Sequence, residues 1–219
     1  MANSAARPTP RPPQRPTRRE RRREETRERI FRAALRLFAQ RGFLQTTVEE
    51  ITEAADVGKG TFFNYFPTKE HVLSSFGDER IAVLRRAEEK SKHGPALEAV
   101  RGALVDLARH SAETPALMRA IFAAHASNEL VRAKLQVRLT EARRIFAQMF
   151  ALAQKRGEVR RDISPELLGR LVHLLFFGVT LAWCMNPDFA LKASATDVWD
   201  LIQPGLKAKS PRGSLREKG

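Results

Sequence analysis

The chain has 219 residues, of which 42% are hydrophobic, and this is enough to bury a substantial core. A single cysteine, Cys184, excludes an internal disulfide and suits a reducing compartment. The formal net charge of +14 indicates a polyanionic partner, but most of this charge lies at the two ends of the chain. Composition alone therefore does not locate the binding surface.

Residues 1–23 hold eight arginines, one glutamate and five prolines, a composition that cannot build a buried face. We predict that this segment is a disordered basic arm. Two roles stay open for it: contact with the phosphates or the minor groove of DNA, or a tail that only keeps the protein soluble. No apolar signal segment follows the arginines, so we expect a cytoplasmic protein.

Residues 24–70 are predicted to form a three-helix domain, and its most informative part is 46–69. Thr47 and Glu50 can form a capping box, in which each side chain binds the backbone N–H of the other residue. Apolar residues follow at helical spacing. Asp56–Gly58 then supply residues that tolerate unusual backbone angles, and a second helix begins at once. This pattern is typical of a helix-turn-helix.

The second short helix carries Phe62 and Phe66 four residues apart, so both are expected to face inward. The polar residues left on or near its outer side are Lys59, Thr61, Asn64 and Tyr65. Base edges in the DNA major groove offer donors and acceptors to such groups. We therefore predict a recognition helix for DNA. The alternative is a helical hairpin without a partner, a motif that also occurs in enzymes.

The residue order GFLQTTVEEI, followed by GKGTFFNYFPTKE, resembles the DNA-binding domain of TetR-family transcriptional regulators over residues 30–73. The resemblance implies that Lys59, Gly60 and Asn64 approach the bases. It also implies that four residues hold phosphates, namely Thr47, Thr61, Tyr65 and Lys69. The remaining two thirds of the chain resemble this family only in length and helical character.

Three positions depart from the pattern of that family. Asp56 and Gly58 stand where the family often has glycine and serine, so the turn and the cap of the second helix are expected to be weaker by about 0.5 kcal/mol. Phe63 stands where the family has its first tyrosine. Because phenylalanine has no hydroxyl, we assign Phe63 no phosphate contact.

The rest of the sequence predicts a helical regulatory and dimerisation domain over 71–206 and a basic disordered tail over 207–219. Glycines, prolines and capping residues divide this part into separate helices. Their predicted ranges are 69–92, 95–111, 115–126, 128–156, 165–185 and 195–203. The predicted fold class is all-α, with an N-terminal helix-turn-helix domain and a larger C-terminal helical domain.

The helix predicted over 165–185 is apolar nearly all round, which favours a position between its own core and a second subunit. We predict a homodimer in which this helix and the last one form a four-helix interface, and the TetR resemblance implies the same pairing. Two recognition helices about 34 Å apart would then read a palindrome. The alternative is a core helix of a monomer. Its apolar run, 171–185, is shorter than the ~20 residues of a membrane span, so no membrane partner is expected.

The resemblance also implies a small-molecule pocket in the second domain. Candidate lining residues are large or polarisable side chains, namely Phe122, His125, Phe146, Met149, Phe150, His173 and Phe177. The two histidines would orient a ligand, although each of these residues also suits ordinary core packing. Acidic residues of these helices fall among polar neighbours. We therefore favour an apolar or weakly acidic effector over a cationic one.

No residue pattern supports enzyme chemistry, a metal site or a cofactor. Gly58–Thr61 lacks the first glycine of a phosphate-binding loop and the hydroxyl residue directly after the lysine. Cys184 has no cysteine partner, and no pair of histidines has the spacing of a zinc site. We predict a sequence-specific transcriptional repressor that a small-molecule effector releases from its operator. The alternative is an architectural or nonspecific DNA-binding protein held by its basic tails.

Overall fold

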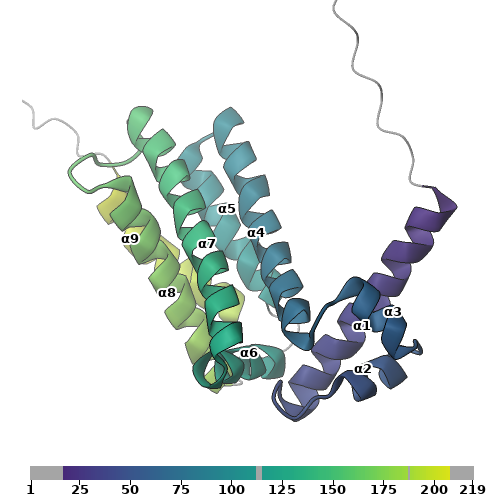
Figure 1. Ribbon diagram of the computed structural model, residues 1–219. Coiled ribbons are helices and arrows are strands. Elements are labelled where there is room, and N and C mark those ends of the chain that lie inside the picture. The colour runs from purple at the N-terminus through teal and green to yellow at the C-terminus, as the bar shows by residue number, and fades with distance from the viewer. Residues whose placement is uncertain (1–16, 112–114, 187, 208–219) are drawn as a thin grey trace, which may run out of the picture.

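The computed structural model describes residues 17–111, 115–186 and 188–207 (Figure 1). The described part confirms the all-α prediction, since its only extended pairing is an isolated bridge between Val159 and Lys207. Its helices are α1 (Arg18–Arg41), α2 (Val48–Ala54), α3 (Lys59–Tyr65), α4 (Lys69–His93), α5 (Ala96–Ser111), α6 (Pro115–Ser127), α7 (Glu129–Lys155), α8 (Pro165–Met185) and α9 (Leu191–Leu206). From α4 to α8, each helix begins and ends within one residue of its predicted range.

The helices form two groups, which Figure 1 shows side by side. The small group is α1, α2 and α3, while α4, α5, α7, α8 and α9 run alongside one another in a larger bundle. α6 lies at the end of the bundle that faces the small group, and it packs against α1. α4 leaves the small group directly after α3 and continues into the bundle. The two groups are therefore joined by α4 and by the contact between α1 and α6.

α1 begins at Arg18, so the prediction of a disordered arm is wrong for residues 18–23. Thr17 starts the helix with a capping box: its hydroxyl accepts a hydrogen bond from the Glu20 N–H at 3.2 Å, and the Glu20 carboxylate accepts one from the Thr17 N–H at 2.7 Å. Arginine is a good helix former, so a segment that buries nothing can still extend a capped helix. The remainder of the predicted arm, 1–16, lies outside the described residues.

α9 begins four residues before its predicted start and ends at Leu206, beyond Pro204. The apolar pattern that sets its true start is Leu191, Ala195 and Trp199, which are buried at four-residue spacing. Lys207 belongs to the folded part rather than to the predicted tail, because it pairs with Val159. The tail over 208–219 lies outside the described residues.

α7 and α8 approach each other closely at Gly169. A Cβ atom added to Gly169 would lie 2.7 Å from the backbone nitrogen of Ala147 and 2.9 Å from the backbone oxygen of Arg143. Any larger side chain would force the two helices apart, since protein interiors pack without spare volume. Gly169 therefore sets the spacing of α7 and α8, on which the walls of the bundle depend.

Candidate DNA-binding surface and ligand cavity

The helix-turn-helix adopts the predicted local structure. The hydroxyl of Thr47 accepts a hydrogen bond from the Glu50 N–H at 3.2 Å, and the Glu50 carboxylate accepts one from the Thr47 N–H at 2.9 Å, so the capping box of α2 is confirmed. The turn is set by Asp56, whose φ of 51° lies in the left-handed region. Ile51 and Phe62 are fully buried and fix α2 and α3 on the core of the small group.

α3 turns a mixed polar and aromatic face outward. Lys59, Gly60, Phe63 and Asn64 are exposed, whereas Thr61 and Tyr65 are half-buried at the margins of that face. The Lys59 ammonium lies 2.5 Å from the carboxylate of Glu49, on α2, an ion pair between two exposed side chains. Such a pair is weak in water, so it leaves Lys59 able to exchange Glu49 for another acceptor.

Two exposed glycines frame the start of α3. Gly58 is its N-cap and makes no side-chain cap hydrogen bond, as expected for a residue without a side chain. A Cβ atom added at Gly60 would meet no atom within 4 Å, and neither would one added at Gly58. The fold itself therefore does not require glycine at Gly60. Glycine would be required at this position only if a bound partner approached the backbone of α3 closely.

Lys69, the first residue of α4, binds the loop between α1 and α2. Its ammonium donates hydrogen bonds to the backbone oxygens of Thr46 at 2.7 Å, Phe43 at 2.9 Å and Leu44 at 3.3 Å. It also lies 4.7 Å from the centre of the Phe43 ring. An ammonium has three donors, and all three are directed at carbonyls here. The predicted phosphate contact of Lys69 stays a prediction, and it would require at least one of these bonds to be given up.

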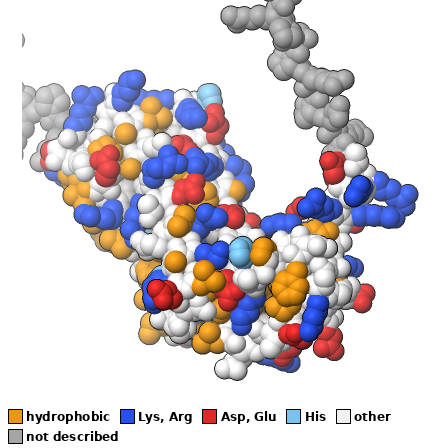
Figure 2. Space-filling view, viewed as in Figure 1, with side chains coloured by type: hydrophobic (Ala, Val, Ile, Leu, Met, Phe, Trp, Pro, Cys, Tyr) orange, Lys and Arg blue, Asp and Glu red, His pale blue; other side chains and the backbone are white. Residues whose placement is uncertain are grey.

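Basic side chains gather at the free end of α1, which projects from the small group (Figures 1 and 2). The exposed arginines of this end are Arg18, Arg19, Arg21, Arg22 and Arg23. The field of this cluster attracts a polyanion over about 8 Å at physiological salt. It therefore adds a sequence-independent positive region to the same domain as α3.

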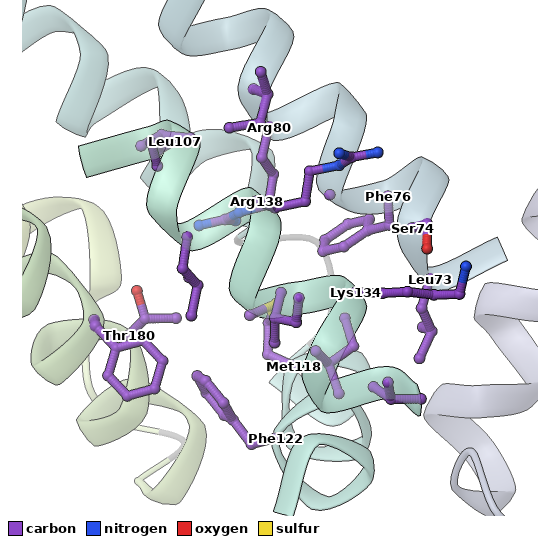
Figure 3. A pocket seen from close by; sticks show the side chains of 18 of the residues that line it. Leu73, Ser74, Phe76, Arg80, Leu107, Met118, Phe122, Lys134, Arg138 and Thr180 are labelled. Carbon is purple, nitrogen blue, oxygen red and sulfur yellow. The ribbon is translucent and has the colours of Figure 1, made fainter. Parts of the chain in front are cut away.

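A cavity of the bundle lies between α4, α6, α7 and α8, and Leu107 of α5 also lines it. It is lined mostly by apolar side chains, together with the charged residues Glu70, Arg80, Lys134 and Arg138. Figure 3 shows Arg80, Arg138 and Phe76 at one end of the cavity and Met118 and Phe122 at the other. The cavity begins beside the small group, because Glu70, in the first turn of α4, contributes to its wall.

Three of the seven predicted ligand residues line this cavity, namely Phe122, His173 and Phe177. The structure does not place the other four there. Phe146, Met149 and Phe150 are fully buried core residues of α7, and His125 lies outside the lining as well. Large apolar side chains at helical spacing fill a core as readily as they line a cavity, so residue type alone did not separate the two.

The cationic residues of the cavity are the ones that sequence reasoning missed. Arg80 lies three and four residues from the lining residues Gly77, Phe76 and Leu84, and Arg138 lies four residues from Lys134 and Ala142. Basic residues in register with an apolar helix face were the available signal. Burial lowers the pKa of Arg80 to about 10, so its guanidinium stays charged at neutral pH.

A second exposed surface runs along α8 and α9. Although α8 is long and apolar enough for a membrane span, half of its most apolar window is buried in the fold. Its outward face carries large apolar residues that are 38% to 77% exposed, namely Leu171, Leu174, Leu175, Leu181 and Met185, and α9 adds Leu201 at 79%. Figure 2 shows hydrophobic side chains along this margin of the molecule. Contiguous apolar surface of this kind marks an interaction site.

A capped helix-turn-helix with a polar outer face, joined by α4 to a helical bundle with an internal cavity, defines a DNA-binding regulator. Residues 30–76 match the family model for bacterial regulatory proteins of the tetR family. The HTH-type transcriptional regulator UidR of Escherichia coli K12 is 27% identical over 167 residues, which cover 76% of this chain and 85% of UidR. Residues 30–76 are therefore a DNA-binding domain of the tetR type, and over most of its length the chain is similar to a transcriptional regulator rather than to an enzyme.

Solved structures agree with this assignment. FadR of Thermus thermophilus, a TetR-family transcriptional repressor in complex with lauroyl-CoA, is 29% identical, with a TM-score of 0.62 over 85% of this chain and 97% of FadR. SmeT of Stenotrophomonas maltophilia, in complex with triclosan, is 20% identical with a TM-score of 0.74 over 86% of this chain and 96% of SmeT. The likeness to SmeT concerns the fold alone.

Proposed function

We propose that this regulator is a homodimeric repressor that occupies a palindromic operator and leaves it when a small molecule fills the cavity of the bundle. The observation that carries the proposal is the position of α4. It begins directly behind the recognition unit at Lys69, and it lines the cavity from Glu70 to Leu84. The proposed function also places the protein in the cytoplasm, where bacterial DNA lies.

In this proposal α3 reads the major groove. Lys59, Gly60 and Asn64 approach the bases, with Lys59 exchanging its Glu49 partner for a base acceptor or a phosphate. Thr47, Thr61 and Tyr65 contact phosphates. Lys69 contributes chiefly by holding the loop before α2 in place through its three carbonyl hydrogen bonds. The arginines at the free end of α1 add affinity without sequence preference.

The apolar face of α8 and α9 supports the dimer. Its leucines lie three and four residues apart along one side of α8, and Gly178, within this stripe, lets a partner helix approach closely. A two-fold axis through this face pairs α8 and α9 with their copies and presents two α3 helices to DNA. Half-sites about one helical turn apart, ~34 Å, then fit the two helices.

Release from the operator would follow because the start of α4 connects the cavity to the α1–α2 loop. A ligand that binds better when the start of α4 is displaced favours that conformation in proportion to its differential affinity. Because Lys69 precedes the cavity residue Glu70 and binds the α1–α2 loop, the displacement moves the recognition unit. A coupling of about 1 to 3 kcal/mol weakens operator binding about 5- to 150-fold, which is enough for a useful switch.

Two measurements test this function. Selection from random duplex DNA should return an inverted repeat, bound about 10³-fold more tightly than scrambled DNA at physiological salt. A specificity ratio near one would instead establish a nonspecific binder held by basic segments. Fluorescence anisotropy on the selected repeat, across a panel of organic acids and neutral apolar compounds, should then show release. Unchanged affinity with every cavity-binding compound would contradict ligand control.

A further inference from the structure

The cavity has a cationic end built around Arg80. The guanidinium of Arg80 lies 6.0 Å from the centre of the Phe76 ring and 5.9 Å from that of Phe176, so two aromatic faces flank it. A guanidinium offers five N–H donors in a planar fork that matches a carboxylate. In this apolar surrounding, its attraction for an anion is much stronger than in water.

His173, on α8, adds a neutral donor to the same lining. Its Nδ1 atom accepts a hydrogen bond from the Nε–H of Arg143 at 3.4 Å, which places the proton of the neutral ring on Nε2. Burial, followed by the charges of Arg143 and Arg80, lowers the pKa of His173 to about 4. The ring is therefore neutral at physiological pH and donates from Nε2.

The charges of the lining are unequal. Three cations, Arg80, Lys134 and Arg138, stand against one acid, Glu70. Arg138 is bound at 2.6 Å to Asp78 of α4, although its buried Nε–H has no acceptor among the described residues, and the Lys134 ammonium lies 3.2 Å from His71. With Asp78 beside Arg138, this region still holds one more cation than acids, which favours an anionic ligand over a cationic one.

The other end of the cavity is apolar and aromatic. The rings of Phe122 and Phe177 meet edge to face with 5.1 Å between their centres, and Met118 lies beside Phe122 (Figure 3). The cavity volume is about 100 Å³, and since one water needs about 10 to 15 Å³ on this measure, there is room for on the order of ten non-hydrogen atoms. This suits a medium-length alkyl chain or one aromatic body.

We propose that the cavity binds an amphipathic organic acid, whose carboxylate is held by Arg80 with help from His173 and whose apolar body lies against Met118, Phe122 and Phe177. This deepens the proposed function and rests on it only in treating the acid as the effector. The carboxylate gains a charge-assisted pair with one edge of the Arg80 fork, while the apolar body supplies the burial that a free inorganic anion lacks.

Isothermal titration with three probes of one chain length tests the head group: decanoate, decan-1-ol and decyltrimethylammonium. Decanoate should bind the wild-type protein about tenfold or more tightly than decan-1-ol, and the ammonium compound should bind weakest. Arg80→Met, which keeps an apolar stem, should bring decanoate and decan-1-ol to within about twofold. Arg80→Lys should retain most of the preference because it keeps the charge.

Arg86→Met is the matched control, since it removes an exposed cation of α4 that does not line the cavity. It should keep the preference for decanoate to within about threefold of wild type. Circular dichroism melts of the three variants identify any loss of fold. If Arg80→Met does not fold, Arg80→Lys is compared with wild type instead. Equal binding of decanoate and decan-1-ol to wild type, no decanoate binding, or an unchanged preference in Arg80→Met would overturn the inference.

Operator affinity, measured with the same probes, distinguishes failure of this inference from failure of the proposed function. Decanoate binding that depends on Arg80 but leaves operator affinity unchanged supports the acid site and contradicts ligand-controlled release. Release by decan-1-ol that is equal in wild type and Arg80→Met supports ligand-controlled release and overturns the acid site.

Discussion

The recognition unit and the cavity are built on different scales. The exposed face of α3 depends on neighbours within about twenty residues, chiefly the Thr47 capping box, the left-handed Asp56 and the buried Phe62. The cavity instead takes its walls from five helices spread between Glu70 and Thr180. A surface set by local chemistry tolerates changes in distant packing, whereas a cavity is only as well defined as the spacing of its helices.

The largest effect is expected at Gly169, where α7 and α8 approach each other closely. Gly169→Ala places a methyl group against the backbone of α7, so the free energy of unfolding should fall by about 3 kcal/mol. Gly102→Ala is the matched control: a Cβ there meets nothing within 4 Å, and helix propensity favours alanine by roughly 0.5 to 1 kcal/mol. Chemical denaturation measures both. Equal stability of the two variants would contradict the close approach of α7 and α8.

The cavity should also make stability depend on pH. Because burial lowers the pKa of His173 to about 4, the unfolded chain takes up this proton first as the pH falls below about 6.5. The free energy of unfolding should therefore fall between about pH 6.5 and 4, by about 3 kcal/mol in total, and this contribution should level off at lower pH. Denaturation of wild type and His173→Gln over this range isolates the effect. Identical pH profiles would contradict a buried neutral ring.

Sequence patterns predicted the local structure of the recognition unit far better than the lining of the cavity. The capping box, the turn at Asp56 and the ends of α4 to α8 follow from local signals such as caps, glycines and prolines, and the structure agrees with them. The arginine-rich start of α1 was predicted to be disordered because it cannot form a buried face. A segment without a buried face can nevertheless be helical. Among the cavity residues, Phe122, His173 and Phe177 were predicted, whereas Arg80 was not. Which faces of distant helices converge is decided by tertiary packing, which one sequence does not display.

A smaller effect should separate fold from recognition at α3. Gly60→Ala should leave the free energy of unfolding equal to wild type or slightly higher, because its Cβ meets no protein atom. Affinity for the selected operator should nevertheless fall about tenfold, since the methyl group stands between the backbone of α3 and DNA. Anisotropy titration measures this, with Gly102→Ala as the control. Full affinity in Gly60→Ala would exclude close contact of this backbone with the bases.

The smallest expected effect concerns the cap of α3. Gly58 has the extended conformation of an N-cap, with φ of −74° and ψ of 155°, but makes no side-chain hydrogen bond. Gly58→Ser supplies the missing acceptor and should raise the free energy of unfolding by a few tenths of a kcal/mol. Thermal melts at matched concentration detect the shift, and a lower melting temperature would mean that α3 starts elsewhere.

In the proposed function, two copies of α3 read DNA in the major groove. Its most direct test is anisotropy titration of wild type and the double variant Lys59→Ala/Asn64→Ala on the selected inverted repeat and on scrambled DNA. We expect the double variant to lose about 10²-fold or more in affinity for the repeat and to keep its weak binding to scrambled DNA. Wild-type affinity and selectivity in a folded double variant would contradict it.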